Sequence, residues 1–281
     1  ESSAASDVYK RQEYGNGVHQ WYCGMQDAGG VLQKGPWVGN RFHWYCLFDN
    51  EDYRITKGVK HRFQYDSQVK NGRGYYYPGT PEYKLMATGK NMDDVKVQEP
   101  VAPFNDGLTY TNSISSNCLA FTTKYADVTD PTIGRTDAYW PFLRYADIVL
   151  IYAEAQCELN DGISQDAIDA LNDIRIRSNA KEASVTGDGA IETKVELRSV
   201  IFEERAKELA YEGDRRWDLL RWGIYLDVMN SLGGINEDGT RTPYDEGSIN
   251  KRREFRHLLY PLPSLEVSTN MAIDKNNPGW N

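Results

Sequence analysis

The densest group of chemically active side chains lies in one charged stretch, EERAKELAYEGDRRWDLL, at residues 203–220. Its candidates for proton transfer are Arg205, Glu208, Glu212, Arg215, Arg216 and Asp218. A pair of carboxylates in such a stretch could act as general acid and base. However, the charges alternate in sign along amphipathic helices, a pattern that favours ion pairs inside the protein. We therefore interpret the stretch as structural and expect Trp217, Leu220 and Trp222 to lie in the core under arginine stems.

Other catalytic and metal-binding patterns are missing from the sequence. Four histidines are scattered along the chain: His19, His43, His61 and His257. They show neither HExxH nor another metal-ligand spacing, and the four cysteines form no CxxC pair. No GxSxG elbow or phosphate-binding loop is present either. The sequence therefore predicts no metal site, no cofactor and no catalytic residue.

Aromatic residues in polar, glycine-rich sequence form the most informative group. Flat aromatic faces can stack on the C–H faces of sugar rings, while amides and charges bond the hydroxyl groups. The predicted platform consists of Trp21, Tyr22, Trp37, Trp44, Tyr45, Tyr75, Tyr76 and Tyr77. The predicted polar partners are Asn40, Arg41, Asn71 and Arg73. Any one of these rings could instead anchor a core or a loop, but as a group they indicate a carbohydrate-binding surface.

Composition excludes several classes of partner. The formal net charge of the 281 residues is −9, which opposes binding to nucleic acid or to an anionic bilayer surface. No apolar run approaches the roughly 20 residues that a membrane-spanning helix needs. We therefore expect no nucleic-acid partner and no membrane-spanning segment.

The helices that would carry these residues lie in the second half of the chain. Apolar residues recur at intervals of three and four in 142–159, which predicts a helix, and Ser164 can cap a second helix that packs on it as a hairpin. Further helices are predicted at 194–211 and 214–232. Residues 14–83 read as long ordered loops, 84–137 as short strand-like segments, and 260–267 as extended chain.

Three stretches and the C-terminal end resemble the SusD/RagB family. They are WPFLRYADIVLIYAEAQCELN (140–160), DAIDALNDIRIRSNA (166–180), EERAKELAYEGDRRWDLLRWG (203–223), and the closing YPLPSLEVSTN and NNPGW. The likeness covers 140–281 well and 13–139 loosely. It implies a mainly α, SusD-like fold with a tetratricopeptide-like helical hairpin, long irregular loops and a few short strands.

The same resemblance implies a function and a location. It implies a non-catalytic protein that binds oligosaccharides or polysaccharides at the cell surface for nutrient uptake. It also implies delivery to a SusC-like TonB-dependent transporter of the outer membrane. A lipid anchor on an N-terminal part that is missing from this chain would provide the membrane contact. Two alternatives stay open from the residues, namely a glycoside hydrolase with two carboxylates across a cleft and a helical-repeat scaffold that binds protein.

The first residues have a different expected origin. SSAASDVYKRQ (2–12) matches, codon for codon, one reading frame of a common transposase-type sequencing adapter. We therefore expect 1–12 to be foreign to the natural protein and 13–281 to form a SusD/RagB-like C-terminal domain. Within it, 13–139 would be rich in loops and aromatics, 140–232 helical and 233–281 rich in loops.

Overall fold

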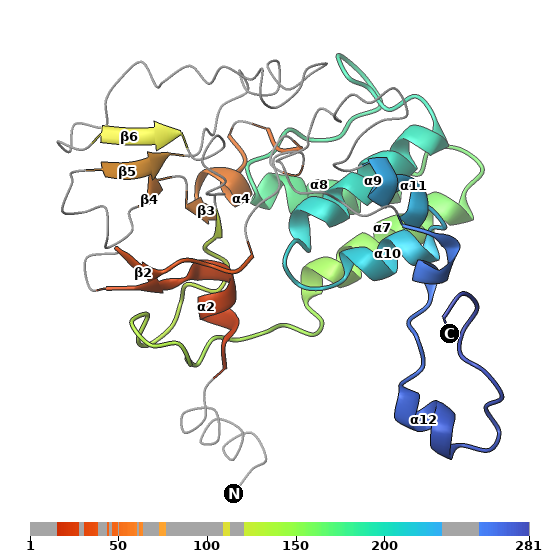
Figure 1. Ribbon diagram of the computed structural model, residues 1–281. Helices are drawn as coiled ribbons and strands as arrows, with labels where there is room; N and C mark the ends of the chain where they lie inside the picture. Colours follow the sequence, from red (N-terminus) through yellow and green to blue (C-terminus); the bar gives the residue numbers. More distant parts are fainter. Residues whose placement is uncertain are drawn as a thin grey trace, which may run out of the picture.

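The computed structural model describes residues 16–27, 31–38, 44, 47–49, 51–60, 62–63, 73–76, 109–112, 121–231 and 253–280. These residues form a helical part and a loop-rich part with short strands, which lie side by side (Figure 1). The longest elements are helices, and the described sheets contain at most three strands. The predicted mainly α fold with a few short strands is confirmed.

A helical hairpin begins the helical part. Helix α7 spans Tyr145–Leu159 and α8 spans Gln165–Arg177, and the two pack along each other (Figure 1). Ser164 caps α8 as expected, because its hydroxyl oxygen accepts a hydrogen bond from the backbone N–H of Ala167. The hairpin predicted from the apolar spacing is therefore confirmed, although α7 begins three residues later than the predicted 142.

Helix α9 (Lys194–Glu208) packs on the hairpin and completes the main core. It begins at a capping box: the Thr193 hydroxyl oxygen accepts a hydrogen bond from the backbone N–H of Glu196, and the Glu196 carboxylate accepts one from the backbone N–H of Thr193. The three helices bury one apolar stripe each, and the most deeply buried members are Leu150, Ala153, Ala167, Leu171, Leu197 and Ile201. Each buried leucine or isoleucine contributes roughly 1.5–3 kcal/mol through burial. This core holds together the three helices, and the charged stretch begins in α9.

The helices after the hairpin differ from the predicted ones at two glycines. The helix predicted at 194–211 ends at Glu208, and a turn with Gly213 at φ 96° leads out of it. The single helix predicted at 214–232 is wrong, because α10 (Arg215–Arg221) and α11 (Tyr225–Ser231) are separate. Gly223 lies between them with φ 73°, a left-handed conformation that ends a helix and that glycine adopts at little cost.

The loop-rich part is built from short elements paired by backbone hydrogen bonds. Its elements are α2 (Val18–Cys23), β1 (Met25–Gln26), β2 (Leu32–Lys34), α4 (Tyr53–Thr56), β3 (Val59–Lys60), β4 (Arg62–Phe63), β5 (Arg73–Tyr76), β6 (Thr109–Asn112) and β7 (Phe121–Thr122). Strand β1 pairs with β2 and β3 with β7, both antiparallel, while β5 lies between antiparallel β4 and parallel β6. The described residues of 14–83, a range predicted as ordered loops, include short helices and strands.

The C-terminal segment projects from the helical part (Figure 1). It contains a 3₁₀ turn, η2 (Phe255–Leu258), and helix α12 (Ser264–Thr269). The extended conformation predicted for 260–267 is therefore wrong from Ser264 onward, because the fixed φ of Pro263 is compatible with the start of a helix. Arg216 holds the base of the segment, since its guanidinium donates to the carbonyl oxygen of His257 at 2.9 Å. Among the described helices, none combines the length and the apolarity needed to cross a bilayer.

Candidate functional site

Two tryptophans lie side by side on the surface of the loop-rich part. Trp21 on α2 is 44% exposed and Trp37, just after β2, is 74% exposed. Their ring centroids are 6.5 Å apart with an interplanar angle of 26°. The backbone N–H groups of Trp37 and Val38 both donate to the carbonyl oxygen of Trp21, at 2.9 and 3.0 Å. We call Trp21 and Trp37 the exposed tryptophan pair.

The inner face of α2 fixes the direction in which Trp21 points. His19 is buried and its Nδ1 lies 2.8 Å from the carbonyl oxygen of Tyr125. The buried Cys23 donates its S–H to the carbonyl oxygen of Thr122 at 3.2 Å. Because these contacts hold one side of the short helix against the 121–138 segment, Trp21 is left on the solvent side.

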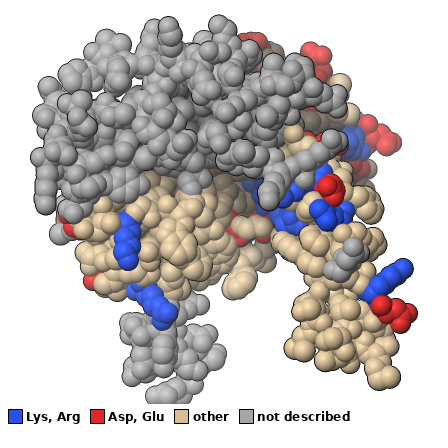
Figure 2. All heavy atoms as spheres, viewed as in Figure 1, with Lys and Arg blue, Asp and Glu red and all other residues tan. Residues whose placement is uncertain are grey.

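The surface around α2 and β2 carries few charged side chains. Among residues 16–27 and 31–38, Asp27 and Lys34 carry a charge, and on the face shown in Figure 2 charged side chains are denser over the helical part than over the loop-rich part. A ring in weakly charged surroundings offers an apolar face to a ligand, for which water competes poorly. The exposed tryptophan pair therefore has the physical character of a stacking platform.

Tyr22, the neighbour of Trp21 in sequence, points the other way. It packs against Tyr125, Trp140 and Tyr211, with ring centroids 5.1, 5.7 and 5.7 Å away. Tyr125 and Trp140 stack at 5.4 Å with an interplanar angle of 7°. Burial raises the pKa of Tyr22 above its usual value. The sequence did not indicate these partners, because they lie 103, 118 and 189 residues further along the chain.

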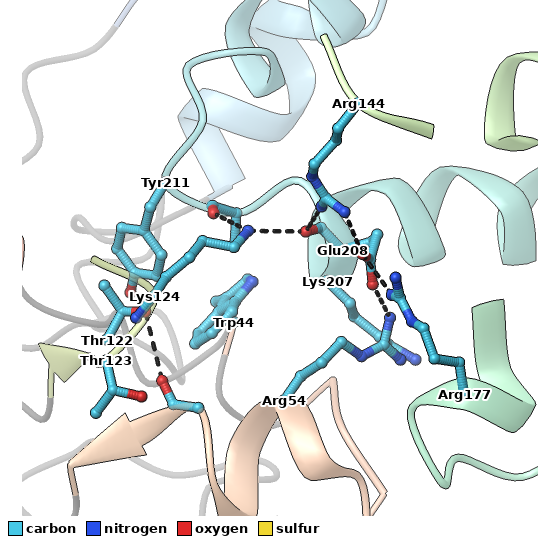
Figure 3. Close-up of a pocket in the computed structure, with 12 residues that line it drawn as sticks. Trp44, Arg54, Thr122, Thr123, Lys124, Arg144, Arg177, Lys207, Glu208 and Tyr211 are labelled. Carbon is cyan, nitrogen blue, oxygen red and sulfur yellow. Dashed lines mark hydrogen bonds and ion pairs between the residues drawn. The ribbon is translucent and has the colours of Figure 1, made fainter. Parts of the chain in front are cut away.

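Trp44 lines a cavity of about 190 Å³ between the two parts of the molecule (Figure 3). Its indole N–H donates to the carbonyl oxygen of Ala206 at 2.8 Å, and its ring meets Phe48 and Tyr211 edge-on. The cavity is further lined by Arg54, Gly58, Thr122, Thr123, Lys124, Arg144, Arg177, Lys207, Glu208 and Ala210. Trp44 is therefore half-buried and fixed by both polar and aromatic contacts.

Glu208 is the centre of the ion pairs beside this cavity. Its carboxylate lies 3.1 Å from Arg54, 2.6 Å from Arg144 and 2.6 Å from Arg177 (Figure 3). Burial alone would raise the pKa of Glu208, but Arg177 and Arg144 outweigh it and lower the pKa to about 2. A carboxyl group with such a pKa stays ionised at neutral pH and cannot donate a proton as a general acid.

The other charges of the stretch are paired in the same way. Arg205 contacts Asp147 and Asp218, each at 2.8 Å, and Glu212 pairs with Lys124 and with Arg144. The structural interpretation of the charged stretch is thus confirmed for these groups.

The aromatic residues of this stretch differ in their burial. Trp222 stacks on Phe202 at 3.5 Å, and Leu220 is half-buried. The core position expected for Trp217 is wrong, because its side chain is 58% exposed beside Tyr260.

The remaining predicted contacts fall outside what the structure describes in full. Asn40, Arg41, Tyr45, Asn71 and Tyr77 lie outside the described residues. Arg73, Tyr75 and Tyr76 belong to β5, for which the backbone pairing is described. In the described portion of the chain, no group of three or more His, Cys, Asp or Glu side chains is arranged to hold a metal ion.

Curated relatives share the sequence of part of this chain. SusD-like protein P2 of Formosa agariphila is 33% identical over 142 residues, which are 49% of this chain and 25% of the relative. SusD-like protein P38 of the same organism is 36% identical over 142 residues, which are 48% of this chain and 25% of the relative. The matching segment thus spans about a quarter of the length of these relatives.

Solved structures share the fold. A SusD superfamily protein from Parabacteroides distasonis superposes with a TM-score of 0.53 at 18% identity, covering 94% of this chain and 46% of the other. A SusD homologue from Bacteroides thetaiotaomicron gives 0.51 at 21% identity, covering 82% and 41%. The sequence pattern of the SusD family matches residues 38–280, which include the helical core and the charged stretch. The chain therefore belongs to the SusD family.

Proposed function

We propose that this chain is part of a non-catalytic protein that binds oligosaccharides or polysaccharides at the bacterial cell surface. The observation that carries the proposal is the exposed tryptophan pair, held in place by backbone hydrogen bonds in weakly charged surroundings. Two adjacent indole faces suit the C–H faces of sugar rings. Asn40, Arg41, Asn71 and Arg73 stay predicted hydroxyl partners, and the tyrosines at 45 and 75–77 stay predicted contacts.

In this proposal the bound glycan passes to a SusC-like TonB-dependent transporter of the outer membrane for nutrient uptake. Membership of the SusD family supports this partner, and a lipid anchor on the full-length protein would keep it at the membrane. Purification of the full-length protein from its native membrane should bring down a β-barrel transporter. Recovery of the protein without such a barrel would count against the partner.

A hydrolase receives no support from the charged stretch. The carboxylates that the sequence offered as acid or base, Glu208, Glu212 and Asp218, are each paired with arginine. In the proposal the protein leaves the glycan intact, so incubation with a glycan should release no new reducing ends. Steady release of reducing sugar by the purified protein would contradict it.

Isothermal titration against a panel of maltoheptaose, cellohexaose, xylohexaose, laminarihexaose and an oligogalacturonate tests the binding. Because the proposed site offers few stacked rings and hydrogen bonds, we expect dissociation constants on the order of micromolar to millimolar. The double substitution Trp21→Ala with Trp37→Ala should remove this binding. Trp217→Ala is the control, because it removes a tryptophan that is 58% exposed on the helical part, and it should leave binding unchanged. Absence of binding to every member of the panel would contradict the proposal.

A further inference from the structure

Gly17 lies directly beneath the indole ring of Trp21. It is the residue before α2, and Trp21 follows one helical turn later. A methyl group on Gly17 would lie 2.9 Å from Cε2, 3.0 Å from Nε1 and 3.1 Å from Cζ2 of Trp21. Carbon atoms in contact normally lie about 3.5–4.0 Å apart. The Trp21 ring thus occupies the space that any side chain at position 17 would fill.

The backbone at Gly17 does not itself require glycine. Its φ of −86° and ψ of 2° lie in the bridge region, which residues other than glycine also occupy. Gly24, at the other end of α2, is different, because its φ is 74° and a Cβ there would lie 2.7 Å from the carbonyl oxygen of Lys34. A side chain at Gly24 would therefore strain the backbone, whereas one at Gly17 would displace the Trp21 ring.

The orientation of this ring sets the geometry of the exposed tryptophan pair. The main chains of Trp21 and Trp37 are joined by a 2.9 Å hydrogen bond, so their relative position is fixed. The separation of 6.5 Å and the angle of 26° between the rings then depend on the side-chain torsions alone. A ring that had to swing away from position 17 would change both values.

We propose that Gly17 is a positioning residue that sets the orientation of Trp21 and, through it, the geometry of the exposed tryptophan pair. The consequence for affinity rests on the proposed glycan binding. The effect of Gly17 on ring orientation does not depend on glycan binding, so the two effects are tested separately.

Fluorine NMR of protein labelled with 5-fluorotryptophan tests the orientation. The seven tryptophans give one resonance each, and Trp21→Phe and Trp37→Phe assign the pair. Gly17→Ala should shift the resonances of Trp21 and Trp37, leave the other five in place and leave the midpoint of urea unfolding unchanged. Gly162→Ala is the matched control, because no atom lies within 4 Å of a Cβ there. Unmoved resonances in Gly17→Ala, or a shift of all seven, would overturn the inference.

Titration with the panel oligosaccharide that binds the wild type most tightly then tests the consequence for affinity. Gly17→Ala should weaken binding by about tenfold, the effect of losing one good aromatic contact. In a Trp21→Ala background the same change should have no further effect, because Gly17 acts through that ring. Weaker binding in Trp21→Ala with normal binding in Gly17→Ala would overturn the inference. Normal binding in both single variants, with the fluorine shifts present, would instead reject the exposed tryptophan pair as the glycan site.

Discussion

Glu208 shows how a buried carboxylate is kept charged. Three guanidinium groups, those of Arg54, Arg144 and Arg177, meet at its two oxygens. Removal of one partner of a buried ion pair typically costs about 3–5 kcal/mol, because the remaining charge stays buried without compensation. The charged stretch of the sequence is thus a structural device that joins α4, α8 and the chain before α7 to the end of α9.

The first prediction concerns this carboxylate and pH. The pKa of Glu208 falls from its ordinary 4.5 to about 2 on folding, so the native state binds fewer protons between these values. Its stabilisation is therefore complete above about pH 4.5 and is lost as the pH falls toward 2, a change of roughly 3 kcal/mol. Glu208→Gln should lower the free energy of unfolding at pH 7 by about 3 kcal/mol or more. It should also flatten the decline in stability between pH 5 and pH 3.

Urea unfolding at several pH values measures both effects. Glu182→Gln is the control, because Glu182 is exposed on the connection between α8 and α9. An unchanged unfolding free energy in Glu208→Gln at pH 7 would show that the ion pairs around Glu208 do not stabilise the fold.

At the residue scale, the sequence pattern did not distinguish exposed rings from inner ones. It grouped Trp21 with Tyr22, but neighbouring residues on a helix point in directions about 100° apart. The structure places one on the surface and the other among inner rings. Gly17 and Trp21 have a helical spacing of four, a signal that is readable only once α2 is known to be a helix. Six residues are too few for periodicity to reveal that helix.

At the scale of elements, prediction succeeded where a helix was long and periodic. Helices α7, α8 and α9 have 15, 13 and 15 residues, enough for an apolar stripe to stand out. Prediction failed at the break between α10 and α11, because the spacing of apolar residues does not reveal the left-handed backbone conformation of Gly223. The β pairings were not predicted, since the strands have only two to four residues and two of the pairs, β3 with β7 and β5 with β6, join segments that lie far apart in the sequence.

The second prediction tests the helical core on one helix. Ile174 and Ile176 both lie on α8, but Ile174 is 3% exposed and Ile176 is 60% exposed. Ile174→Ala should lower the free energy of unfolding by about 2–5 kcal/mol, because it leaves a cavity between the three helices. Ile176→Ala should change it by less than about 0.5 kcal/mol. Urea unfolding of both variants measures the difference, and equal losses would contradict the packing of α8.

At the scale of the whole molecule, α7 has two apolar faces. One packs on α8 and α9, while Tyr145, Ile148, Ile151, Tyr152 and Leu159 are exposed. Contiguous apolar surface of this kind promotes association in water. The chain also spans less than half of the SusD structures that it matches.

The third prediction follows from this surface. The 281-residue chain should self-associate as its concentration rises, which sedimentation velocity would detect as a growing sedimentation coefficient. Combining Ile148→Glu with Tyr152→Glu should reduce the association, because two charges would interrupt the apolar face of α7. Ile176→Glu places a charge on the exposed side of α8 and serves as the control. A monomer at all concentrations, or equal effects of both changes, would contradict the role of α7.

The molecule therefore combines a rigid helical frame with a binding surface on short, irregular elements. The ion pairs and the three-helix core define the frame, while α2 and the turn after β2 display the exposed tryptophan pair. In our proposal, specificity comes from how the loops hold these rings, a property that depends on contacts between distant segments. This division also explains why the family could be identified from the helical half of the sequence alone.

One titration tests the central proposal most directly. The 5-fluorotryptophan protein, titrated with the oligosaccharide that binds it, reports on each of its seven indole rings separately. We predict that the resonances of Trp21 and Trp37 move in a saturable way, while those of Trp44, Trp140 and Trp222 stay in place. Saturable movement confined to other tryptophans, with Trp21 and Trp37 unaffected, would contradict sugar capture by the exposed tryptophan pair.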